Sequence, residues 1–109
     1  ETVGLAWIVI LGFLRVSTHP RVLPNPIDHS DALAIVNEWL ALPCVEIVSP
    51  SQRHWRILNE LLEPLSTAGN LTSDAHLAAL AIEYGAQLHS ADHDFGRFPG
   101  LRWVDPLKG

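Results

Sequence analysis

The chain has 109 residues, of which 48% are hydrophobic and 17% are charged, and its formal net charge is −5. This length and composition suit one folded domain over residues 1–109 and exclude a disordered chain. The acidic balance argues against a general nucleic-acid binder held by long-range attraction. The basic residues are nevertheless almost all arginines, whose planar guanidinium groups suit the recognition of phosphate.

The longest apolar run extends from Leu5 to Leu14 and ends at Arg15. It is too short to span a bilayer, and no positively charged segment precedes it as in a signal peptide. We therefore expect no membrane association. Cys44 is the single cysteine and cannot form an intrachain disulfide, which fits a reducing compartment, the cytoplasm.

The first part of the chain predicts two helices separated by a proline-rich connection. The run from Leu5 to Arg15 predicts a buried helix of about three turns, because it is longer than most strands. Prolines between Pro20 and Pro26 exclude a regular element there. Asp28 or Ser30 caps the next helix, which Pro43 ends. Residues three and four positions apart form its apolar face: Ala32, Ile35, Val36, Trp39 and Leu40.

A short strand is predicted at Val45–Val48, and Pro50 then suits the first turn of a third helix. The pattern predicts that Pro64 ends or bends this helix. Its apolar stripe is expected to consist of five large side chains: Trp55, Leu58, Leu61, Leu62 and Leu65.

The last part of the chain predicts one more helix followed by two short strands. Thr72 or Ser73 caps the helix from Asp74 to Tyr84, after a loop at Gly69-Asn70. Gly85 stands where a left-handed residue ends a helix. The remaining elements are a strand at 86–89, a turn at 98–100 and a strand at 101–104. Helices that alternate with short apolar strands indicate an α/β fold with a parallel sheet.

Acidic side chains stand at two places that this fold brings to one edge of the sheet. Asp74 enters a helix, and Asp92 and Asp94 directly follow the strand that comes after that helix. Ligands of open α/β sheets bind beyond the carboxyl ends of the strands. Converging carboxylates repel one another unless a cation neutralises them, and hard oxygen ligands select Mg²⁺ or Mn²⁺. A purely structural interpretation stays open: Asp74 is favoured by the helix dipole, and Asp92 and Asp94 suit an Asx-type turn.

The residues around these acids resemble a known family. The segments Thr72–Ala78 and Ser90–Phe98, together with Phe13-Leu14-Arg15 and the ending Pro99–Trp103, are similar to PIN-domain ribonucleases. More narrowly, they resemble the VapC-type toxins of bacterial toxin–antitoxin pairs. The resemblance covers essentially the whole chain. It implies a three-layer α/β/α fold with a short, mainly parallel sheet.

The resemblance also implies an activity, a site and partners. The activity is a Mg²⁺- or Mn²⁺-dependent endoribonuclease, in which Asp74 and Asp92 bind the metal and Asp94 supports them. The partners are an RNA substrate, a VapB-type antitoxin and a second copy of the chain. The family's first catalytic aspartate has no counterpart here, so we expect an N-terminal segment that carries a strand and this aspartate to be absent from the sequence. The family's usual glutamate would fall near Phe13, which cannot bind metal. This favours an alternative, a catalytically inactive PIN-like module that binds RNA or protein.

The remaining polar residues give weaker signals. Arg97, five residues after Asp92, and Arg15 are candidates for contacts with RNA phosphate; a structural pairing of Arg97 with Asp94 or Asp105 remains open. No HxxEH spacing occurs among the six histidines, so a histidine-based transition-metal site is not expected.

Overall fold

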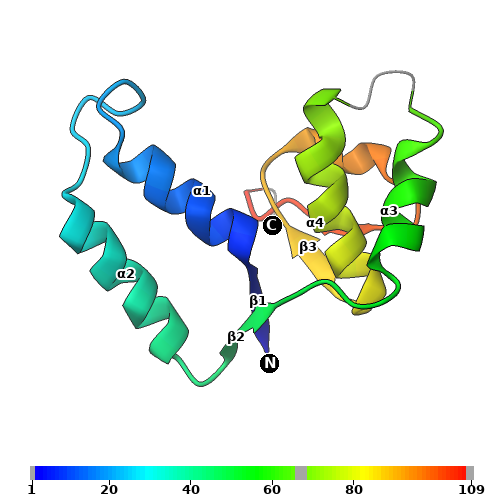
Figure 1. The fold of residues 1–109 in the computed structure, drawn as a ribbon, viewed down its shortest axis with the longest axis horizontal. Coiled ribbons are helices and arrows are strands. Elements are labelled where there is room, and N and C mark those ends of the chain that lie inside the picture. The colour runs from blue at the N-terminus through cyan, green and yellow to red at the C-terminus, as the bar shows by residue number, and fades with distance from the viewer. Residues whose placement is uncertain (1, 66–68, 108–109) are drawn as a thin grey trace. The chain divides into compact units, whose positions relative to one another are not determined.

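The computed structural model describes residues 2–65 and 69–107 (Figure 1), and its contacts divide the chain into two compact units that meet at Ser49–Pro50. The first unit contains β1 (Val3–Ala6), α1 (Trp7–Thr18), α2 (His29–Ala41) and β2 (Val45–Val48). The second contains α3 (His54–Leu62), the 3₁₀ helix η1 (Gly69–Leu71), α4 (Thr72–Glu83), β3 (Gln87–His89), the 3₁₀ helix η2 (His93–Arg97) and β4 (Arg102–Val104).

The first unit is built on the parallel pair β1 and β2, which lie side by side in Figure 1 with Val3 opposite Val45 and Ala6 opposite Val48. The two helices form the connection between these strands, as parallel pairing requires a long crossover. The carboxylate of Asp28 caps α2 by accepting the Ser30 N–H. This confirms one of the two caps that the sequence allowed.

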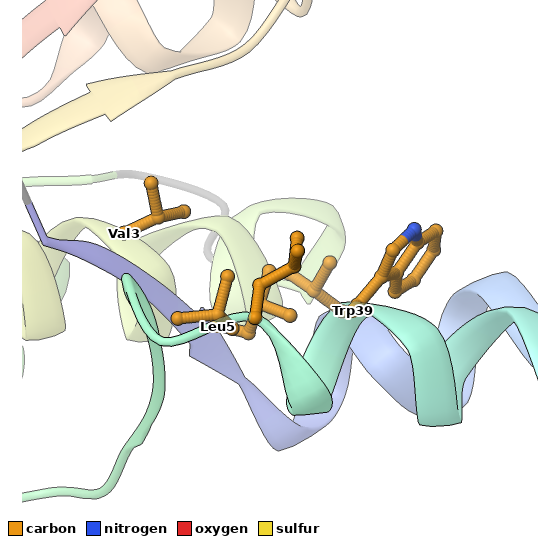
Figure 2. Close-up of a pocket in the computed structure, with 6 residues that line it drawn as sticks. Val3, Leu5 and Trp39 are labelled. Atoms are coloured by element: carbon orange, nitrogen blue, oxygen red, sulfur yellow. The ribbon is translucent and has the colours of Figure 1, made fainter.

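Side chains from both helices and from β1 form the apolar interior of this unit. Ile10 of α1 and Ala32 and Val36 of α2 are buried, and the Phe13 ring packs against Trp39 with centroids 4.7 Å apart. Figure 2 shows Val3, Leu5 and Trp39 at an apolar pocket of about 260 Å³. The lining residues are Val3, Leu5, Val9, Trp39, Leu42 and Val45.

The predicted helix from Leu5 to Arg15 is wrong at its beginning and in its burial. The backbone remains extended through Ala6, where β1 pairs with β2, and only then becomes helical. Several side chains of α1 that the sequence assigned to the interior are exposed, with 52% of Trp7 and 59% of Leu11 accessible. The strand prediction for Val45–Val48 is confirmed.

The second unit is organised around α4, which packs against α3, β3 and η2 (Figure 1). Ala75, Ala78 and Ala79 of α4 are completely buried, because their small side chains allow neighbouring elements to approach closely. The core cluster consists of Ile57, Leu61, Leu71, Ala75, Ala78, Ala79, Phe95 and Phe98. Strands β3 and β4 pair in parallel, with Gln87 opposite Arg102.

A Schellman motif ends α4 and confirms the predicted role of Gly85. Gly85 has a φ of +64°, and its N–H donates to Ile82 O, whereas the Ala86 N–H donates to Ala81 O at 2.8 Å. The predicted N-terminal cap is wrong. Helix α4 begins at Thr72, and Leu71, which offers no side-chain acceptor, takes the N-cap position because η1 runs directly into α4.

The details predicted for α3 need two corrections. The helix begins at His54, so Pro50 precedes its first turn instead of forming it. Trp55 is 70% exposed, whereas Ile57, which was not assigned to the stripe, is buried with Leu61. The α/β class itself is confirmed, since helices alternate with short parallel strands in the described residues. None of the helices within those residues combines the length and the apolar character needed to cross a bilayer.

Candidate metal centre

Asp74 lies in the first turn of α4 and is half-buried. Its position follows from η1, which delivers the chain into α4 so that residue 74 stands at the start of the helix. The neighbouring residue Ala75 is completely buried in the core cluster. The backbone that carries Asp74 is therefore firmly packed.

Asp92 and Asp94 come from the turn that follows β3. The carboxylate of Asp92 accepts the Asp94 N–H at 2.9 Å and thereby caps η2, while the Asp92 N–H donates to the Ser90 hydroxyl at 3.1 Å. This is the Asx-type turn that the sequence offered as a structural interpretation of these two acids. The turn fixes the backbone between Asp92 and Asp94 and so sets the spacing of the two acids.

The three aspartates converge in the second unit. One carboxylate oxygen from each of Asp74, Asp92 and Asp94 lies within 4.8 Å of the other two. Burial, and then the negative charges of Asp92 and Asp94, raise the pKa of Asp74 above its ordinary value. In the absence of a cation the charged form of Asp74 is therefore disfavoured.

This donor set fits a hard divalent cation. Three carboxylates offer only oxygen atoms, which Mg²⁺ and Mn²⁺ prefer, and their mutual repulsion is relieved when a cation lies between them. Mg²⁺ ordinarily keeps several water molecules, so a complete protein cage is not required. Asp74, Asp92 and Asp94 are the residues that would hold the ion.

The predicted RNA-contacting arginines lie in different environments. The Nε of Arg97 lies 3.3 Å from Asp94 Oδ1 within η2, which is the structural pairing that the sequence left open. Most of the Arg97 side chain remains exposed, at 62%, so it also remains accessible to a ligand. Arg15 is exposed in the last turn of α1, which belongs to the first unit.

Phe13, at the position where the resemblance placed a glutamate, is half-buried on α1 and packs against Trp39. It contributes an aromatic surface to the interior of the first unit and no ligand atom. The sequence offers no carboxylate at this position. In the structure Phe13 has a packing role instead.

Sequence reasoning missed a polar chain on another side of α4. His54 of α3 bonds to Glu83 through Nδ1 at 2.6 Å and to His76 through Nε2 at 2.9 Å. Glu83 was given no role, although an acid in an otherwise apolar helix indicates a buried partner. Its spacing of seven residues from His76, two helical turns, was the available signal. His93 was also left unassigned, and it contacts Asp105 at 3.2 Å and the Trp103 ring at 5.5 Å.

Comparisons with known proteins identify the family of the chain. The PIN domain family model matches residues 2–101. The chain is 47% identical over 106 residues to "Ribonuclease VapC33" of Mycobacterium tuberculosis strain H37Rv, covering 97% of this chain and 74% of that protein. It is 44% identical to "Ribonuclease VapC37" over the same shares, and 42% identical to "Ribonuclease VapC43" over 100% of this chain and 74% of that protein, both from the same strain.

The range matched by the family model extends across both compact units. With a family model over most of its length and relatives above 40% identity, the chain belongs to the PIN-domain family, among its VapC-type members.

Proposed function

We propose that this protein is a Mg²⁺- or Mn²⁺-dependent endoribonuclease that acts as the toxin of a type II toxin–antitoxin pair. The observation that carries the proposal is the convergence of Asp74, Asp92 and Asp94, whose oxygens lie within 4.8 Å of one another. Relatives that are named ribonucleases and align over nearly the whole chain support RNA as the substrate.

The proposed roles of the side chains follow from their contacts. Asp74 and Asp92 hold the cation, and Asp94 supports the site. Arg97 restrains the carboxylate of Asp94. A divalent ion at this position would neutralise the three acids and lower the pKa of water for attack on a phosphodiester. Arg97 has most of its side chain free in solvent and contacts RNA phosphate, with Arg15 as a second contact.

The proposal includes the partners and the organisation of the protein. Residues 1–109 form a single PIN-like domain, which pairs with a second copy and is inhibited by a VapB-type antitoxin. The names of the relatives support the antitoxin, since they identify VapC proteins. The protein acts in the cytoplasm, where its RNA substrate is found, and does not associate with membranes.

Cleavage of RNA by the full-length protein tests the activity. Wild type is compared with Asp74→Asn, Asp92→Asn and the control Glu60→Gln, which neutralises an exposed acid of α3 outside the cluster. With Mn²⁺ we expect each aspartate variant to lose at least about 100-fold in rate, since even residues behind metal ligands contribute roughly 10- to 100-fold. Glu60→Gln is expected to cleave like wild type.

A second candidate function rests on Phe13, which offers a packing surface where the family has a glutamate. In this alternative the protein binds RNA or a partner protein without cleaving it. Retained RNA binding by an intact protein that shows no cleavage with Mn²⁺ or Mg²⁺ would favour it. Equal cleavage by wild type and both aspartate variants would instead contradict the assignment of the site.

A further inference from the structure

The side chain of Glu83, at the end of α4, is completely buried and surrounded by hydrogen-bond donors. Its Oε1 accepts the Ser51 N–H at 2.6 Å, and its Oε2 contacts His54 Nδ1 at 2.6 Å. Arg53 also donates to the backbone carbonyl of Glu83. Burial opposes ionisation, but the bonds from Ser51 and His54 outweigh it and lower the pKa of Glu83. The carboxylate is therefore ionised and held by the segment that begins α3.

His54 also bonds to a second residue of α4, His76. Its second ring nitrogen, Nε2, lies 2.9 Å from His76 Nδ1, and the two imidazole rings meet edge to face at 4.8 Å. Glu83 and His76 are seven residues apart, so they share one face of α4 across two turns. A single ring from α3 thus contacts the side chains of two α4 residues whose backbone positions are two turns apart.

The carboxylate determines one proton position in this bridge. Because ionised Glu83 only accepts, Nδ1 of His54 carries a proton and donates it to Oε2 of Glu83. Nε2 of His54 and Nδ1 of His76 share the second hydrogen bond. Both ring nitrogens of His54 are therefore bonded to side chains of α4.

Two contacts on one face of a helix fix its rotation about its own axis. Asp74 precedes His76 by two residues and therefore points to a different side of α4. A side-chain tip lies about 5–6 Å from the axis, so a rotation of about 10° moves the carboxylate by roughly 1 Å. Metal–ligand distances tolerate only about 0.2 Å, which makes the rotation of α4 decisive for a shared ion.

We propose that His54 is a positioning residue for the acidic cluster: by bonding to Glu83 and His76 together it fixes the rotation of α4 and hence the position of Asp74. This inference rests on the proposed function, since it presumes that the aspartates bind a divalent cation. His54 bonds to Glu83 and His76 and not to the aspartates, so it acts on the cluster through α4.

Calorimetric titration of the full-length protein with Mn²⁺ tests the inference. Replacing His54 alone leaves a buried carboxylate unpaired and endangers folding. The variant is therefore His54→Phe combined with Glu83→Leu, which keeps the ring and the apolar volume but removes the bridge and the buried charge together. We expect the dissociation constant for Mn²⁺ to rise about 5- to 10-fold, at the lower end of effects from residues behind metal ligands.

Two controls separate positioning from general stability. In Glu83→Gln the side-chain amide accepts the Ser51 N–H and donates to His54 Nδ1, so His54 donates from Nε2 to His76 and the bridge survives. This variant is expected to bind Mn²⁺ within about twofold of wild type, and ¹⁵N NMR would report that Nδ1 of His54 no longer carries a proton. Leu61→Ala removes a buried apolar contact of the same helix and is expected to lower the free energy of unfolding but not Mn²⁺ affinity.

The outcomes are distinct. The positioning role is overturned if the double variant binds Mn²⁺ like wild type, or if Leu61→Ala weakens binding as much as the double variant. If wild type itself binds no Mn²⁺, the proposed function fails and the inference fails with it. Weakened binding in the double variant alone, with both controls near wild type, supports the role of His54.

Discussion

Asp74 is held in an environment that opposes its charge, and this predicts how the metal-free protein responds to pH. The pKa of Asp74 is raised above 3.8 by burial and by Asp92 and Asp94. Between 3.8 and the raised pKa the folded state therefore binds more protons than the unfolded state. The free energy of unfolding falls as the pH rises through this window. Asp74→Asn removes this term, so the variant gains stability relative to wild type as the pH rises.

The geometry gives the size of the effect. Two unit charges 4.8 Å apart, the upper limit for one carboxylate oxygen from each residue, repel by about 0.9 kcal/mol in water. Asp74 has two such neighbours, but Asp92 is exposed and Arg97 pairs with Asp94, so both repulsions are screened. We expect the repulsion to contribute about 1 kcal/mol between acidic and neutral pH, and burial adds to it in the same direction.

Urea unfolding in EDTA, measured from about pH 3.5 to pH 7, checks this value. Relative to wild type, Asp74→Asn is expected to shift its midpoint upward by at least roughly 0.5 M over this range, for a typical m-value of about 2 kcal/mol/M. Added Mn²⁺ is expected to stabilise wild type much more than the variant, because only wild type binds the ion well. A difference between the two proteins that stays constant with pH would refute the reasoning.

Three further substitutions probe separate features. Arg97→Gln is expected to reduce the slope of log K for RNA binding against log salt concentration by about 1. An unchanged slope would show that Arg97 pairs with Asp94 and does not contact phosphate. Gly85→Ala is expected to cost about 1 kcal/mol in urea unfolding because φ is +64°; no atom obstructs the new methyl group, so a larger loss would contradict a purely backbone effect. Ala78→Leu, at a fully buried position of α4, is expected to cost about 1–3 kcal/mol, and unchanged thermal and urea stability would contradict the tight packing described.

Local signals explain which parts of the fold were predictable. The strand Val45–Val48 lies between Pro43 and Pro50. Gly85 ends α4 with the positive φ that a Schellman motif needs. The boundary between β1 and α1 has no such signal, because Ala6 and Trp7 lie within one uninterrupted apolar run. Which end of that run becomes extended depends on pairing with β2, which is not encoded locally.

The candidate site also has one part that the sequence predicts and one part that it does not. The convergence of Asp74 with Asp92 follows from the order of helix and strand, so chain topology was sufficient to expect it. The bridge from His54 to Glu83 and His76 depends on how α3 packs against α4, and no single segment contains that information. Trp55 illustrates the same limit, since its hydrophobicity suggested burial but the packing of α3 leaves it exposed.

The turn at Asp92 determines which substitutions are informative at this position. Asparagine retains an oxygen that can accept the Asp94 N–H, so it removes the charge and leaves the loop intact. Alanine also removes the acceptor, and the backbone that carries Asp94 then loses its anchor. An alanine scan would therefore overstate the chemical importance of Asp92. The difference in activity between its asparagine and alanine variants measures how much of the loss comes from disruption of the turn.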